Sequence, residues 1–127
     1  MNLEKVVFAF FILLALTLNF GFFLGDLTDP VQHSAYALFA ALVVSLIASV
    51  LKIGHRTHVD AMLLATSLVA DLQLVTAAIV WGVVVYGMGI EMNAHYMSII
   101  VSLSGGALLA NIISVIILII ETSTNRL

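Results

Sequence analysis

Four long apolar runs, separated by short polar segments, constrain this 127-residue chain more than any other feature. An α-helix needs roughly 20 apolar residues to cross the hydrocarbon core of a bilayer. The runs meet this requirement and cover about residues 6–25, 34–51, 61–88 and 96–120. We therefore predict an all-α membrane protein in contact with the lipid bilayer, folded as a single four-helix transmembrane domain over residues 1–127.

The composition supports the same class. The chain is 63% hydrophobic and 9% charged, whereas soluble domains are about 45–50% apolar and about 25% charged. A soluble fold of this size has too much surface to hide so much apolar area. The chain has no cysteine, which excludes disulfides and thiolate metal sites. It also lacks a basic cluster of the kind that binds nucleic acid.

The basic residues predict the orientation, because loops rich in lysine and arginine stay in the cytoplasm. All four fall on one side of the predicted spans, whereas the connections 26–33 and 89–95 contain none. They are Lys5, Lys52, Arg56 and Arg126. We expect an up-down bundle with antiparallel neighbours and both termini in the cytoplasm, located in a bacterial inner (cytoplasmic) membrane. So uneven a charge distribution also predicts that any homo-oligomer is parallel.

Small residues recur at every fourth position in two spans, a spacing typical of close helix–helix contacts in membranes. The fourth span carries Ser98, Ser102, Gly106, Ala110 and Ser114. The second span carries Ala37, Ala41, Ser45 and Ser49. We expect tight packing at Ser102, Gly106, Ala110, Ala41 and Ser45. The alternative is that one serine-bearing stripe lines a narrow polar path.

Asp71 is the principal candidate for function. It lies eleven residues past Asp60, roughly 15 Å into the membrane at about 1.5 Å per residue. An ionised carboxylate is costly there, and such residues usually face a bundle interior or a water-filled cavity. The candidate partners are Asn111, Asn19 and Ser67. No lysine or arginine lies at this depth, which leaves a proton, a transported cation, water or neutral amides as its partners.

Polar residues lie on two faces of the third span. Asp60, Ser67 and Asp71 share one face, because they are seven and four residues apart. The opposite side of the helix carries Thr66, Gln73 and Thr76. A four-helix monomer cannot easily enclose one of its own helices on both sides. We therefore predict a homo-oligomer, or a larger membrane partner, with the third span near the interface.

The connections contain two candidate metal or proton sites. On the outer side, two of the three carboxylates precede a histidine by four residues. These are Asp29, His33, Glu91 and His95, a set that could bind a divalent metal such as Zn²⁺ or sense pH. On the inner side, His55, His58 and Asp60 form a second set. The alternative is that these loop histidines are simply solvated. No other cofactor is expected.

Together these features predict a parallel homo-oligomeric ion channel or proton-conducting pathway that favours cations. Its candidate lining residues are Asp71, Gln73, Asn111, Asn19 and Ser67. The alternative is a non-transporting accessory subunit that docks a larger membrane complex through its buried polar face. Enzymatic activity is not expected, because no nucleophile–base pair is apparent. All four histidines lie in the connections, away from where haem would bind within a span.

Overall fold

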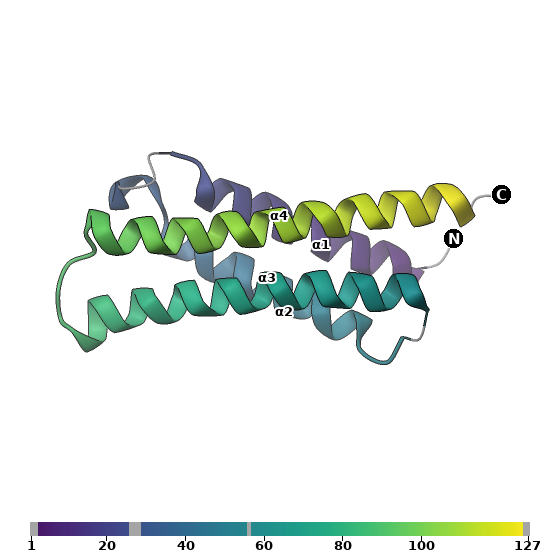
Figure 1. Ribbon diagram of the computed structural model, residues 1–127, viewed down its shortest axis with the longest axis horizontal. Helices are drawn as coiled ribbons and strands as arrows, with labels where there is room; N and C mark the ends of the chain where they lie inside the picture. The colour runs from purple at the N-terminus through teal and green to yellow at the C-terminus, as the bar shows by residue number, and fades with distance from the viewer. Residues whose placement is uncertain (1–2, 26–28, 56, 126–127) are drawn as a thin grey trace.

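The computed structural model describes residues 3–25, 29–55 and 57–125, which form four long helices (Figure 1). The helices are α1 (Leu3–Phe23), α2 (Ala35–Lys52), α3 (His58–Gly82) and α4 (Ala94–Asn125). A 3₁₀ turn, η1 (Pro30–Gln32), precedes α2, and a π-helical turn, η2 (Val83–Gly87), extends α3. All four helices are long and apolar enough to cross a membrane, so the four predicted long apolar helices are confirmed.

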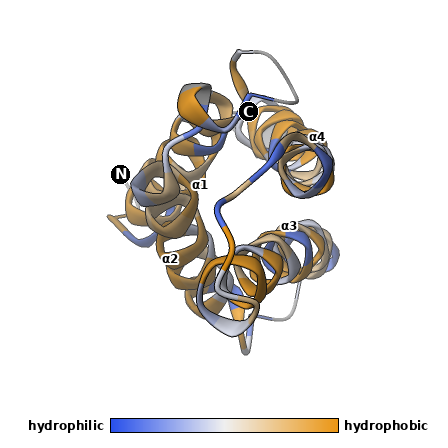
Figure 2. Cartoon of the chain, turned by 90° about the vertical axis from the view of Figure 1, so that its left-hand side faces the viewer, coloured by the Kyte–Doolittle hydropathy of each residue, from blue (hydrophilic) through white to orange (hydrophobic). Residues whose placement is uncertain are grey.

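The four helices pack as an antiparallel bundle. Both termini lie at the same end in Figure 1, and Figure 2 shows the helices arranged around a common centre. Each helix packs against its neighbour in the chain, and α1 closes the bundle against α4. Large apolar side chains remain on the outer surface, such as Leu72 at 68% and Leu109 at 63% exposure. This surface suits lipid, because its side chains are apolar and the helices satisfy their backbone hydrogen bonds internally.

Local hydrogen bonds set the ends of two helical segments. The hydroxyl of Thr57 accepts a hydrogen bond from the backbone N–H of Asp60 and donates one to its carboxylate, so Thr57 caps α3. Before η1, the carboxylate of Asp29 accepts a hydrogen bond from the N–H of Val31. Proline at the first position of η1 suits a helical start, because its ring presets φ.

The core has two apolar clusters with polar side chains between them. One cluster lies in the half of the bundle away from the termini and includes Phe22, Leu38, Leu74 and Met97. The other, which we call the apolar layer, consists of Phe8, Ile12, Ala48 and Leu63. Along their helices, buried polar residues fall between the two clusters, among them Ser45, Ser67, Asn111 and Ser114.

The end of the bundle that carries both termini is rich in ion pairs, and we call it the charged end. It contains Glu4, Lys5, Lys52, His55, Asp60 and Glu121. Lys5 and Lys52, two of the four basic residues behind the predicted orientation, lie here. The other two, Arg56 and Arg126, lie outside the described residues. Which end faces the cytoplasm therefore stays a prediction from the sequence.

Candidate functional site

Asp71 lies in the interface between α3 and α2. Its side chain is buried, with 5% of the residue exposed. One carboxylate oxygen accepts a hydrogen bond from the hydroxyl of Ser45, and the other accepts one from Ser49, each at 2.5 Å. Ser45 and Ser49 are four residues apart and share one face of α2. The two serines of the predicted packing stripe thus hold both oxygens of the buried carboxylate.

These partners differ from the predicted ones. Asn19 does not pair with Asp71: its amide bonds the hydroxyl and the carbonyl of Ser104, at 2.5 and 3.2 Å. This contact joins α1 to α4 instead. The expectation that Asn19 partners Asp71 was wrong, because α1 lies across α4 at this level and presents Asn19 to that helix.

Besides the buried Oε1 of Gln73, two further polar side chains find no hydrogen-bond partner within the described residues. They are Ser67 on α3 and Asn111 on α4, both fully buried. Asn111 lies ten residues from Glu121, and Asp71 lies eleven from Asp60, so both are roughly 15 Å from the charged end. Ser67 is one helical turn from Asp71, on the same face of α3. A carboxylate, a hydroxyl and an amide are therefore buried at neighbouring levels of the bundle.

The second polar face of α3 packs against α4 of the same chain. Thr66 hydrogen-bonds to Ser114. The Gln73 amide lies over Gly106, where an added Cβ would come within 2.6 Å of it. Thr76 donates to its own backbone, at the carbonyl of Leu72. Within one chain, α2 and α4 flank α3 at Asp71, Thr66 and Gln73, whereas Thr76 stays exposed. A homo-oligomer or larger partner beside α3 stays a prediction.

This arrangement bears on the prediction that the polar faces of α3 contact another protein. They were predicted to face an oligomer interface or a larger partner, yet the contacts of Asp71, Gln73 and Thr66 lie inside one bundle. The accessory-subunit alternative was based on a polar face available for docking. Because these side chains turn inward, that alternative has less support than the sequence suggested.

The predicted packing stripes hold at most positions. Ala41, Ser45 and Ala110 are buried, and Gly106 admits the Gln73 side chain. Ser102 differs from the prediction, because it is exposed and its hydroxyl donates to the carbonyl of Ser98 at 2.7 Å. The contact face of α4 is rotated toward Ser104 and Ala107, which are fully buried, so the every-fourth-residue stripe is not the whole contact face.

The candidate outer metal site gains no support. Nowhere in the described part of the chain do three or more histidine, aspartate or glutamate side chains come together as a metal would require. Asp29 caps η1, and the buried His33 ring contacts the carbonyl of Phe22 at 2.6 Å. Glu91 and His95 are exposed. Metal binding by these four residues stays a prediction.

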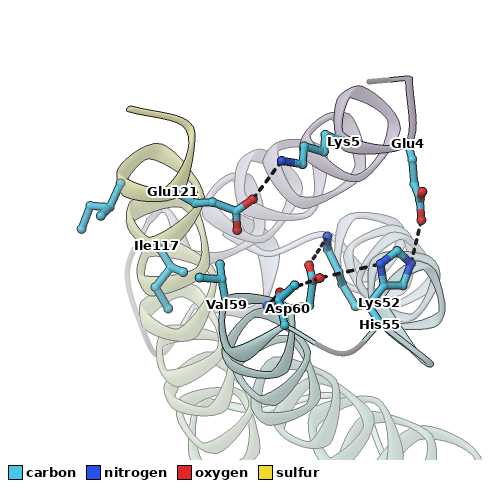
Figure 3. A pocket seen from close by; sticks show the side chains of 10 residues that line it. Glu4, Lys5, Lys52, His55, Val59, Asp60, Ile117 and Glu121 are labelled. Atoms are coloured by element: carbon cyan, nitrogen blue, oxygen red, sulfur yellow. Dashed lines mark hydrogen bonds and ion pairs between the residues drawn. The ribbon is translucent and has the colours of Figure 1, made fainter. Parts of the chain in front are cut away.

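The charged end contains a network of ion pairs that was not predicted from the sequence. Figure 3 shows its ion pairs, in which Lys52 Nζ lies 2.9 Å from Asp60 and Lys5 Nζ lies 3.4 Å from Glu121. His55 contacts Glu4 at 2.6 Å. One feature of the sequence could have predicted this network. Lys52 is a charged residue at the end of a predicted span, where a lysine needs an acidic partner.

A protein-family model matches residues 32–122, which cover α2, α3, most of α4 and the connections between them. Searches of curated proteins and of solved structures found no significant match. The matched region includes Asp71, both serines that bond it, and the unpartnered Ser67 and Asn111. It spans well over half of the chain, so the protein belongs to the family described as a family of unknown function (DUF6394).

Proposed function

We propose that this protein conducts a small cation, a proton or an alkali-metal ion, across the membrane, with Asp71 as the carboxylate that binds it. The proposal depends on one observation. Asp71 is buried in the bundle and bonded by two hydroxyls, and no basic side chain of the described residues pairs with it. Hydroxyls alone compensate a buried negative charge poorly, so a proton or a cation is the expected further partner.

The chemistry around Asp71 supports a hard cation. The buried groups near its level include several oxygen ligands: the carboxylate, the hydroxyl of Ser67 and the amide oxygens of Asn111 and Gln73. Oxygen ligands suit hard cations, whereas soft transition metals prefer thiolates and imidazoles. Ser67 and Asn111 have no partner among the described residues, so their hydrogen-bonding capacity is available to an ion or its hydration water.

The path in this proposal passes through the interior of each protomer, because Asp71 and Asn111 lie between helices of one chain. The protomers assemble as a parallel homo-oligomer, which agrees with the one-sided distribution of basic residues. The proposal assigns transport and no enzymatic reaction to the chain. Light scattering of the detergent-solubilised protein would give the number of subunits.

The test is ion flux in liposomes that contain the purified protein. Fluorescent reporters of H⁺, Na⁺ and K⁺ would follow flux driven by a concentration gradient and by a membrane potential. We expect Asp71→Asn to lower flux at least about tenfold, the factor that roughly 1.4 kcal/mol of lost binding produces. The matched control is Glu91→Gln, the same acid-to-amide change at an exposed position outside the bundle interior.

The two variants separate the outcomes. Loss of flux in Asp71→Asn with normal flux in Glu91→Gln supports the proposal. Wild-type liposomes that carry none of the three cations faster than empty liposomes would overturn it. Equal flux in wild type and Asp71→Asn would remove Asp71 from the path.

A further inference from the structure

A pocket opens at the charged end, between the ends of all four helices (Figure 3). Its volume is about 610 Å³, large enough for a cluster of water molecules or a hydrated ion. Acidic and basic side chains surround it: Glu4, Lys5, Lys52, His55, Asp60 and Glu121. Val59 and Ile117 form part of its apolar wall.

The pocket ends at the apolar layer. Val59 and Ile117 line the pocket and also pack against Phe8, Ile12, Ala48 and Leu63. Ions and water avoid such a layer, because it offers no polar partner. On α1 and α3, Phe8 and Leu63 therefore lie between the pocket and the level of Asp71, whereas on α2 Ser49, which bonds Asp71, directly follows Ala48.

Lys52 is located at this boundary. Its Nζ lies 2.9 Å from a carboxylate oxygen of Asp60 and 4.4 Å from the centre of the Phe8 ring. A carboxylate and an aromatic face are two groups that bind cations. Only 6% of the Lys52 side chain is exposed, although it lines the pocket. The ammonium group thus occupies a cation site built from α1 and α3.

The polar residues that follow on α2 and α3 run from this site toward Asp71. Ser49, which bonds Asp71, is one helical turn from Lys52 on α2. On α3, Ser67 lies seven residues from Asp60 and four from Asp71, roughly 10 Å and 6 Å along the helix. Its hydroxyl has no partner among the described residues. Ser67 is therefore located where an ion or a proton would pass between the two aspartates.

We infer that the pocket is the entrance through which cations reach Asp71, and that the tethered ammonium of Lys52 closes it. This inference rests on the proposed function. When Lys52 leaves Asp60 and Phe8, an incoming cation takes its place, and displacement of Phe8 opens the apolar layer. Lys5 has no such role, because 51% of its side chain is exposed and its pair with Glu121 lies at the pocket rim.

The test uses the absence of cysteine in the sequence, so that one introduced thiol reports on one position. Ser67→Cys would be labelled in liposomes with a small ammonium-bearing methanethiosulfonate, and mass spectrometry would give the rate. Adding Lys52→Met removes the ammonium and keeps the length of the side chain. We expect the labelling rate to rise at least about tenfold, as when a rarely populated open state becomes the main one.

Two matched controls accompany this variant. Lys5→Met removes a lysine from the same pocket and should leave the rate unchanged, and Lys52→Arg, which keeps the positive charge, should also label slowly. Ala77→Cys, fully buried in the other half of the bundle, reports on general loosening. An unchanged Ser67→Cys rate in Lys52→Met, or an equal rise at Ala77→Cys, would overturn the inference.

Flux measurements separate this inference from the proposed function. In the same liposomes, Lys52→Met should raise cation flux and Lys5→Met should not. If wild type and Lys52→Met both carry no cation while labelling still depends on Lys52, the proposed function fails but the closure stands. If flux depends on Asp71, but neither labelling nor flux depends on Lys52, only the closure of the entrance by Lys52 is refuted.

Discussion

The contact between α2 and α3 at Asp71 predicts a measurable coupling free energy between the carboxylate and the two serine hydroxyls that bond it. The perturbation is the pair Ser45→Ala and Ser49→Ala, which removes the two hydroxyls that bond the carboxylate. The same pair is then placed in an Asp71→Ala background. There, Ser49 keeps its second acceptor, the carbonyl of Ser45 at 3.2 Å, so removal of its hydroxyl should cost little.

The size of this coupling free energy follows from the number of hydrogen bonds and from their environment. Hydrogen bonds between side chains in a membrane protein average about 0.6 kcal/mol and reach about 1.7 kcal/mol. Two such bonds to one buried carboxylate predict a coupling free energy of roughly 1–3 kcal/mol. The upper part of this range applies to a charged acceptor, because hydrogen bonds to charged groups are about twice as strong as those between neutral groups.

The assay is reversible unfolding in mixed micelles, with increasing sodium dodecyl sulfate. The single tryptophan, Trp81, reports tertiary structure, since its ring centroid lies 6.4 Å from that of Phe22. Circular dichroism would confirm that the helices remain. Ser102→Ala is the control, because this exposed serine bonds only the backbone of its own helix and should not change the unfolding midpoint.

The coupling free energy is the difference between the cost of the two serine substitutions with Asp71 present and with Asp71 absent. A value below about 0.5 kcal/mol is the size expected of independent sites. That result would refute the reasoning, because the two hydroxyls would then not be energetic partners of the carboxylate.

Two further substitutions test the contacts of α4 by the same titration. Gly106→Ala should destabilise the bundle by about 1 kcal/mol, the low end for overpacking, since its Cβ would lie 2.6 Å from the Gln73 amide, the end of a flexible side chain that can move aside. Adding Gln73→Ala should recover most of this loss, and a double variant no more stable than Gly106→Ala would contradict the contact. Asn19→Ala should cost about 1 kcal/mol, because it removes two hydrogen bonds to Ser104. If Ser104→Ala lowers the free energy of unfolding by the same amount in the Asn19→Ala variant as in the wild type, the two residues are not partners.

The sequence by itself determined the class of fold and the approximate bounds of the helices. A bilayer accepts an unbroken helix of roughly 20 apolar residues and little else. The first span was expected at about residues 6–25, and α1 is Leu3–Phe23; the second was expected at 34–51, and α2 is Ala35–Lys52. The depth of Asp71 followed from counting residues along a helix of known rise.

The tertiary structure decided which side chains meet. Counting residues places Asp71 and Asn111 at one depth, but it does not say how each helix is rotated about its axis. Ser45 and Ser49 were recognised as packing residues, and only the rotation of α2 against α3 made them partners of the carboxylate. In the same way, Gln73 found Gly106 on α4 rather than a neighbouring protomer.

The physical reason lies in the solvent. In lipid, apolar side chains gain little from contact with another helix, so the hydrophobic pattern does not select a neighbour. Close packing and a few hydrogen bonds select it, and these depend on the relative rotation and position of whole helices. The sequence therefore determined that four helices cross a membrane with an acid among them. Only the packed bundle decided that Asp71 is held by two serines and that Lys52 lines a pocket at the charged end.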